Sequence, residues 1–258
     1  MMFLANVSFA ALPVFLPQII KEYVASLDLD AMANWFSMGY TSSAAQALTI
    51  PPNIIAFFVL LLTTWLSDRF RSRSVPIVIL ALTSAFGYLL LGGAAMLQRS
   101  LNNLPGELAD IESPTSAWLS EQMQSSAQLV STGSLTVMRY AGITLVVSTV
   151  FSIVAITIVW NGNNSETETG RGAGMVLLQM LGQCGPLLGT NLYPSEDGPE
   201  YLAGSLVTGI CMVSVAILAV VQRIRLARLN RRRDKEELMA HAESADGATV
   251  EKRFRFML

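Results

Sequence analysis

Charged residues are scarce in this sequence of 258 residues, and so are cysteine and histidine. Only 14% of the residues are Asp, Glu, Lys or Arg, whereas an average soluble domain has about 25%. A net charge of −2 does not favour nucleic-acid binding. Two cysteines in apolar runs and one histidine provide neither a disulfide framework nor a metal-ligand pattern. Because a nucleophile elbow and a phosphate-binding loop are also missing, we expect neither an enzyme nor a cofactor.

Apolar residues, by contrast, make up 52% of the sequence and are gathered in long uncharged runs. A helix needs about 20 apolar residues to cross a hydrocarbon core of about 30 Å. We therefore predict an all-α membrane protein with six transmembrane helices, over residues 3–20, 48–66, 75–97, 140–160, 173–190 and 202–222. These helices would form one domain over residues 1–237, followed by a flexible cytoplasmic tail over residues 238–258.

The distribution of basic residues predicts the direction of these spans, because cytoplasmic loops carry an excess of Lys and Arg. Six spans place both termini on one side of the membrane. That side would hold 14 of the 17 basic residues, whereas Lys21, Arg99 and Arg139 lie on the other. We predict an integral, multi-pass protein of the plasma membrane with both termini in the cytoplasm.

Two connections between the predicted spans are longer than a compact helical bundle usually needs. Residues 21–47 and 99–138 are polar, mixed and without a strong period. We expect both to be surface segments that are partly disordered.

The segment SDRFRSR, at the cytoplasmic end of the second span, combines an acidic residue with closely spaced arginines. Such a group can cap a helix end and pair with neighbouring helix termini, which would hold the second and third spans together. A stop signal that only follows the positive-inside rule is the alternative. The residues of this predicted loop motif are Asp68, Arg69, Arg71 and Arg73.

The order of several further segments is similar to that of a known family. Pro51 and Pro52 lie in the second span, and the fourth span begins with MRYAG and ends with VWNGN. GTNLYPSEDGPEY follows the fifth span, and RIRLARLNRRRD follows the sixth. With SDR, these segments resemble the fungal allantoate and nicotinate permease-like transporters, the anion:cation symporter group of the major facilitator superfamily. The resemblance places the chain at the seventh to twelfth helices, excluding the two long connections and the distal tail.

This resemblance implies a secondary transporter of small organic anions, such as vitamin-like or ureide carboxylates, which works by alternating access. In this superfamily two six-helix halves rock about a central site, so one half forms one wall of the cavity. We expect a fragment or a truncated gene product that transports only when an amino-terminal half or a second copy joins it. The alternative is a non-transporting six-span protein that associates with full-length carriers. The expected partners are the anion, with or without a co-transported proton, and the lipid bilayer, but no nucleic acid.

The fifth predicted span is rich in glycine and contains a proline. Small residues let helices approach closely, and proline can break a helix where a transporter bends. Tight static packing and a gate are both compatible with this pattern. The residues concerned are Gly182, Gly185, Pro186 and Gly189.

Polar side chains inside spans are costly in lipid and mark candidate sites. By resemblance, the first, second, fourth and fifth spans would line the central cavity. There Arg139, at the outer edge of the fourth span, would attract a substrate carboxylate electrostatically and amides would donate hydrogen bonds, although interhelical contacts or interfacial anchoring are alternatives for each. The candidate substrate-binding residues are Asn6, Gln18, Asn53, Arg139, Gln179 and Gln183. No Asp or Glu lies within a predicted span, so a proton site would have to come from elsewhere.

Overall fold

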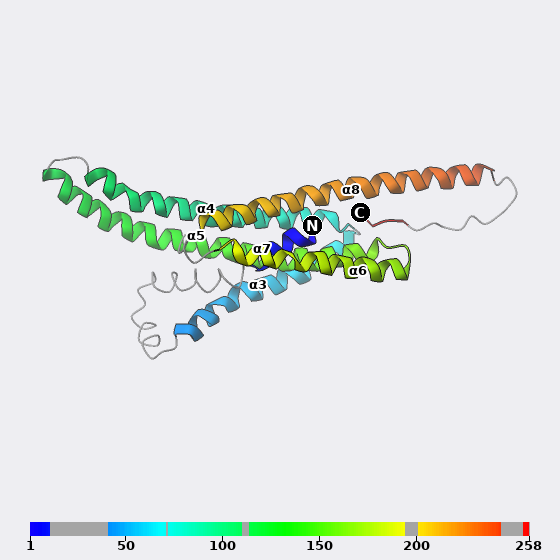
Figure 1. Cartoon of the computed structure of the whole chain (residues 1–258), viewed down its shortest axis with the longest axis horizontal. Coiled ribbons are helices and arrows are strands. Elements are labelled where there is room, and N and C mark those ends of the chain that lie inside the picture. The colour runs from blue at the N-terminus through cyan, green and yellow to red at the C-terminus, as the bar shows by residue number, and fades with distance from the viewer. Residues whose placement is uncertain (11–40, 71, 110–113, 194–200, 244–254, 258) are drawn as a thin grey trace.

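A computed structural model describes residues 1–10, 41–70, 72–109, 114–193, 201–243 and 255–257. Within these residues the structure consists of α-helices and the turns that join them, without a strand. A helix over residues 2–10 comes first. Figure 1 labels the longer helices α3 (Thr41–Phe70), α4 (Ser74–Ala109), α5 (Pro114–Asn163), α6 (Glu168–Gln183), α7 (Gly185–Asn191) and α8 (Leu202–Glu243).

Four of these helices are long and apolar enough to cross a membrane. They include Ile50–Phe70, Ser74–Ser100, Val137–Asn163 and Leu202–Met239. The second, third, fourth and sixth predicted windows are thereby confirmed as apolar helices. The first window lies largely outside the described residues, and the fifth is divided between α6 and α7. A multi-pass helical membrane protein is therefore supported, whereas the number of six spans stays a prediction.

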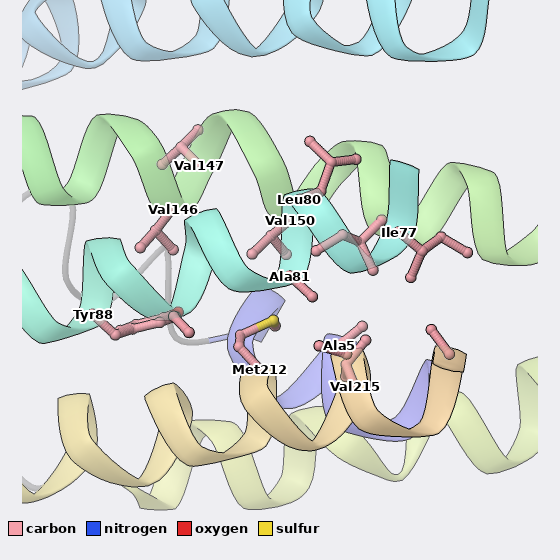
Figure 2. Packing of buried hydrophobic residues seen from close by; sticks show 14 of the residues in the cluster. Ala5, Ile77, Leu80, Ala81, Tyr88, Val146, Val147, Val150, Met212 and Val215 are labelled. Carbon is pink, nitrogen blue, oxygen red and sulfur yellow. The ribbon is translucent and has the colours of Figure 1, made fainter. Parts of the chain in front are cut away.

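α4 lies between α5 and α8 and contacts both of them (Figures 1 and 2). Buried aliphatic side chains fill these contacts, among them Ile77, Val146 and Met212 (Figure 2). Large apolar side chains also face outward, and Phe58 and Leu89 are each more than half exposed. Because the helices are apolar on their outer faces as well as in the core, lipid is the solvent that suits them.

Two glycines bring α4 and α5 into close contact. A Cβ added to Gly87 would lie 2.9 Å from the backbone oxygen of Gly142, and a Cβ added to Gly142 would lie 2.9 Å from that of Gly87. A side-chain movement cannot relieve either contact, because the opposing atoms belong to the backbone. Small residues at a crossing allow this approach between membrane helices. Gly87 and Gly142 therefore allow α4 and α5 to lie closer together than residues with a Cβ would permit.

The connection between α4 and α5 differs from the expectation for residues 99–138. Instead of an irregular segment, α4 continues to Ala109 and α5 begins at Pro114. Both helices extend together past the rest of the bundle (Figure 1). A continued helix pairs the backbone N–H and C=O groups of its interior, and proline is favoured in a first turn. The other long connection, 21–47, lies outside the described residues up to residue 40.

The expected flexible tail, residues 238–258, begins inside a helix. α8 runs to Glu243, well past the apolar part of the sixth window. Residues 255–257 lie against α8 and against the turn between α5 and α6. The end of the chain thus returns to the helical bundle.

Candidate functional site

The helix over residues 2–10 packs closely against α6 and α7. A Cβ added to Gly185 would lie 2.5 Å from the backbone oxygen of Phe3, and a Cβ added to Gly189 would lie 2.5 Å from that of Val7. The contacts advance in the same direction along both partners, so the helices run parallel, as the first and fifth spans of an up-and-down series would. We call this contact the glycine seam.

The fifth predicted span is interrupted beside this seam. α6 ends at Gln183, and α7 begins at Gly185 with Pro186 in its first turn. Proline has no N–H and cannot bond to the carbonyl four residues earlier, which here belongs to Gly182. The N–H of Cys184 bonds to that carbonyl instead. The Gly-Pro pair thus lies at a one-residue interruption, Cys184, whose own backbone stays in the right-handed helical region. A gate at this position stays a prediction.

Asn6 is the candidate substrate-binding residue that lies in the glycine seam. It is 5% exposed, and its Nδ2 would lie 3.1 Å from a Cβ added to Gly182. An amide at this depth offers two N–H donors and a carbonyl acceptor. Asn6 is therefore placed where α6 ends, next to the break before α7.

The other candidate amides are not brought to this position by the structure. Gln179 and Gln183 lie on α6 but are exposed. Asn53 is exposed on α3 and donates a hydrogen bond of 2.9 Å to the backbone oxygen of Thr49. Gln18 lies outside the described residues. A common site for all six candidates stays a prediction.

Arg139 is the second buried member of the candidate set. It lies in the apolar part of α5 and is 5% exposed. A guanidinium keeps its charge in proteins, and a charge within a span is a functional-site candidate by default. Arg139 therefore supplies a buried positive charge, which suits an anionic ligand better than a cationic one.

The predicted loop motif forms the turn between α3 and α4. Asp68 and Arg73 form an ion pair across this turn, and the side chain of Arg73 is 9% exposed. The pair thus ties the last turn of α3 to the first turn of α4. Arg69 is exposed, and Arg71 lies outside the described residues.

A buried polar cluster has no counterpart among the sequence-based candidates. The hydroxyls of Tyr193 and Thr208 are 2.7 Å apart, and the hydroxyl of Tyr88 donates to the backbone oxygen of Ser8 over 3.5 Å. Tyr88 also lies next to this part of α8, because a Cβ added to Gly209 would lie 3.3 Å from the Cβ of Tyr88. We call Ser8, Tyr88, Tyr193 and Thr208 the tyrosine cluster, which links helix 2–10, α4, the end of α7 and α8.

Tyr193 is the tyrosine of this cluster that lies outside the predicted spans. Burial raises the pKa of Tyr193, which lies beyond α7, well above its usual value. Buried tyrosines usually find a hydrogen-bond partner. In the sequence, the only sign of the tyrosine cluster is that Tyr88 lies within an apolar run and Tyr193 follows one.

Comparison with curated proteins matches the chain to transporters. It is 24% identical to the major facilitator-type transporter hxnP of Emericella nidulans over 204 residues. It is 22% identical to an uncharacterized transporter of Schizosaccharomyces pombe over 221 residues, and 22% identical to the MFS transporter prlL of a fungal species over 219. The matches cover 78%, 86% and 84% of the chain. No protein-family profile and no solved structure matches it.

The chain spans about a third of the length of the curated relatives it matches, since the same matches cover 33%, 34% and 37% of those proteins. The apolar helices and the relatives support an integral, multi-pass membrane protein. The names of the relatives support, more specifically, a membrane transporter of the major facilitator superfamily.

Proposed function

We propose that the chain forms one wall of a secondary transporter that moves small organic anions by alternating access. The observation that carries this proposal is the break between α6 and α7 beside the glycine seam. At a rise of 1.5 Å per residue the two helices together are about 36 Å long, and a hydrocarbon core is about 30 Å thick. As one span interrupted at Cys184, α6 and α7 would cross the membrane as part of the half that rocks during alternating access.

Two buried polar side chains on different helices, Arg139 and Asn6, support the anionic substrate of this proposal. Arg139 supplies the positive charge, and Asn6 supplies amide donors at the helix break. Charge-assisted hydrogen bonds between a guanidinium and a carboxylate are among the strong ones in proteins. The anion:cation symporter group, with vitamin-like or ureide carboxylates as substrates and symport of a cation such as a proton, is part of this proposal.

The direction of the chain in the membrane is also proposed. Arg73 lies just before α4, Arg171 lies in the first turn of α6, and Arg233 lies on α8 beyond the sixth predicted window. The predicted topology has cytoplasm at all three positions, so both termini would face that side, in the plasma membrane. The remaining wall of the cavity comes from an amino-terminal half of a transporter or from a second copy of this chain. The chain matches about a third of each relative, which supports the proposal that another half or a second copy supplies the rest of the cavity.

Uptake of labelled nicotinate, allantoate and related anions tests the proposed function. The chain is expressed in transporter-deficient yeast, alone and together with the amino-terminal half of the Emericella relative. We expect uptake at least about tenfold above background with the added half, and little uptake by the chain alone unless two copies pair. If the chain inserts in the membrane and no anion enters under either condition, the proposed transport is contradicted, which favours the alternative of a non-transporting protein that associates with full-length carriers.

A further inference from the structure

The last described residues of the chain occupy a site at the end of the bundle. Phe256 and Met257 lie between α8 and the turn that joins α5 to α6. α4 separates α5 from α8 along the bundle. The segment therefore adds a second connection between α8 and the α5–α6 turn, beside the ion pair of Arg233 with Glu166. Figure 1 shows residues 255–257, in red, near α8.

The backbone of the segment is recognised by side chains. Asn230 forms two hydrogen bonds with Phe256, because its Nδ2 donates to the backbone oxygen over 2.9 Å and its Oδ1 accepts from the backbone N–H over 3.0 Å. The N–H of Met257 donates to Oδ1 of Asn164 over 2.9 Å. Nε1 of Trp160 donates to the oxygen of Met257 over 3.0 Å. All four polar backbone groups of the two residues are thus paired.

One of the receiving side chains, Asn164, is also held by a hydrogen bond that does not involve the segment. Nδ2 of Asn164 donates to the backbone oxygen of Trp160 over 3.0 Å, which leaves its Oδ1 directed at the N–H of Met257. Trp160 itself is 4% exposed. An ordered amide pays little entropy when it accepts a hydrogen bond. These features are typical of a binding site that is built into the surface.

Side-chain contacts add specificity to the backbone bonds. The guanidinium of Arg233 lies 4.3 Å from the centroid of the Phe256 ring, which is a cation–π contact. Arg255 pairs with Asp234 over 3.0 Å. The site therefore accepts an extended peptide with a basic residue followed by an aromatic one.

We propose that Trp160, Asn164 and Asn230 form a peptide-binding site, and that residues 255–257 of the same chain are its ligand and act as a releasable latch. A tethered ligand has a high effective concentration, so a few hydrogen bonds hold it closed and are still easily broken. Separation of α8 from the α5–α6 turn requires release of this latch and of the ion pair between Arg233 and Glu166. In a transporter that separation would accompany opening of the cavity on the cytoplasmic side, a consequence that rests on the proposed function.

Cross-linking in the full chain tests the site itself. Nδ2 of Asn163 lies 3.5 Å from Sδ of Met257, so these two positions are suited to cross-linking. Both are changed to Cys in a chain in which Cys184 and Cys211 are changed to Ser. The double variant is treated with a short bis-maleimide in native membranes. We expect rapid cross-linking of this pair. Asn230→Ala removes two hydrogen bonds and should slow the reaction about tenfold or more. Asn230→Asp keeps one acceptor for the N–H of Phe256 and should give an intermediate rate.

Two controls make the outcome specific. Asn191→Ala removes an amide of the same type, which bonds to the oxygen of Leu187 at the end of α7, and should leave the cross-linking rate unchanged. Cysteines at 134 and 257 should not be joined, because Ser134 lies near the other end of the α5 span. Equal rates for Asn230→Ala and Asn191→Ala, or cross-linking of 134 to 257 as fast as of 163 to 257, would overturn the proposal. The assay contains no substrate, so a failure of transport does not affect it.

Spin labels test the latch function separately from the site. Labels at Thr169 on α6 and Lys235 on α8, both exposed, report the distance across the latch in the chain with both native cysteines changed to Ser. Asn230→Ala should broaden this distance distribution toward longer values, while Asn191→Ala should not. An unchanged distribution in Asn230→Ala would contradict the latch.

Discussion

Replacing Gly185 with valine is expected to separate α7 from the N-terminal helix. A Cβ at this position would lie 2.5 Å from the backbone oxygen of Phe3 and 3.0 Å from the backbone nitrogen of Val7. Because backbone atoms cannot rotate away, both helices must shift, and the two further methyl groups of valine enlarge the shift. Overpacking of this kind costs about 1–3 kcal/mol or more, so the upper end of that range is expected here.

Gly172→Val is the matched control for this substitution. Gly172 also lies on the α6–α7 unit, but a Cβ added there would meet nothing within 4 Å, so the change from glycine to a β-branched residue is the same without the clash. For the purified protein in detergent, Gly185→Val should lower the midpoint of thermal unfolding by about 6–12 °C relative to Gly172→Val. Equal midpoints would show that the glycine seam does not hold these helices together.

Replacing Arg139 with alanine should cause the largest loss of transport. The substitution removes a buried positive charge from α5, and a hydrogen bond to a charged group contributes about 1.5–3 kcal/mol. Anion uptake in the yeast assay with the added half should therefore fall about 10- to 100-fold. Arg139→Lys keeps the charge but not the planar pair of donors, so we expect partial uptake.

Arg99→Ala provides the comparison for Arg139→Ala. Arg99 is predicted to lie on the same side of the membrane but is exposed at the end of the α4 span, so its removal changes the total charge equally without emptying a buried site. Uptake should remain within about twofold of the parent, because an exposed charge is screened. Equal uptake in the two variants, at equal amounts in the membrane, would remove Arg139 from the substrate site.

The apolar helices could be predicted because a bilayer demands long uncharged runs, and α4, α5 and α8 contain them. The helical structure of residues 99–109 and 114–138 could not be predicted in this way. Hydrophobic periodicity is the main signal for a helix in a single sequence, and this polar segment has little of it. Its helices continue from apolar spans, which supply the nucleus that an isolated helix would lack.

The candidate site was only partly predictable for a different reason. Polar residues in apolar runs identify which spans carry amides, but not which way each helix is rotated, and so Asn6 is buried while Gln179 and Gln183 are exposed. Tyr88 did not stand out because tyrosine is common in apolar runs. The contacts of residues 255–257 are made largely by backbone groups, which leave no pattern of side chains to detect.

The account depends on α6 and α7 crossing the membrane as one broken span, and labelling of single cysteines on either side of them tests this most directly. Gly172→Cys and Asp197→Cys are introduced separately into a chain in which Cys184 and Cys211 are changed to Ser. In intact cells a membrane-impermeant maleimide should label the cysteine at 197, and should label the cysteine at 172 only after permeabilisation. If both positions are labelled in intact cells, or neither is, α6 and α7 do not cross, and the six-span wall of a transporter is contradicted.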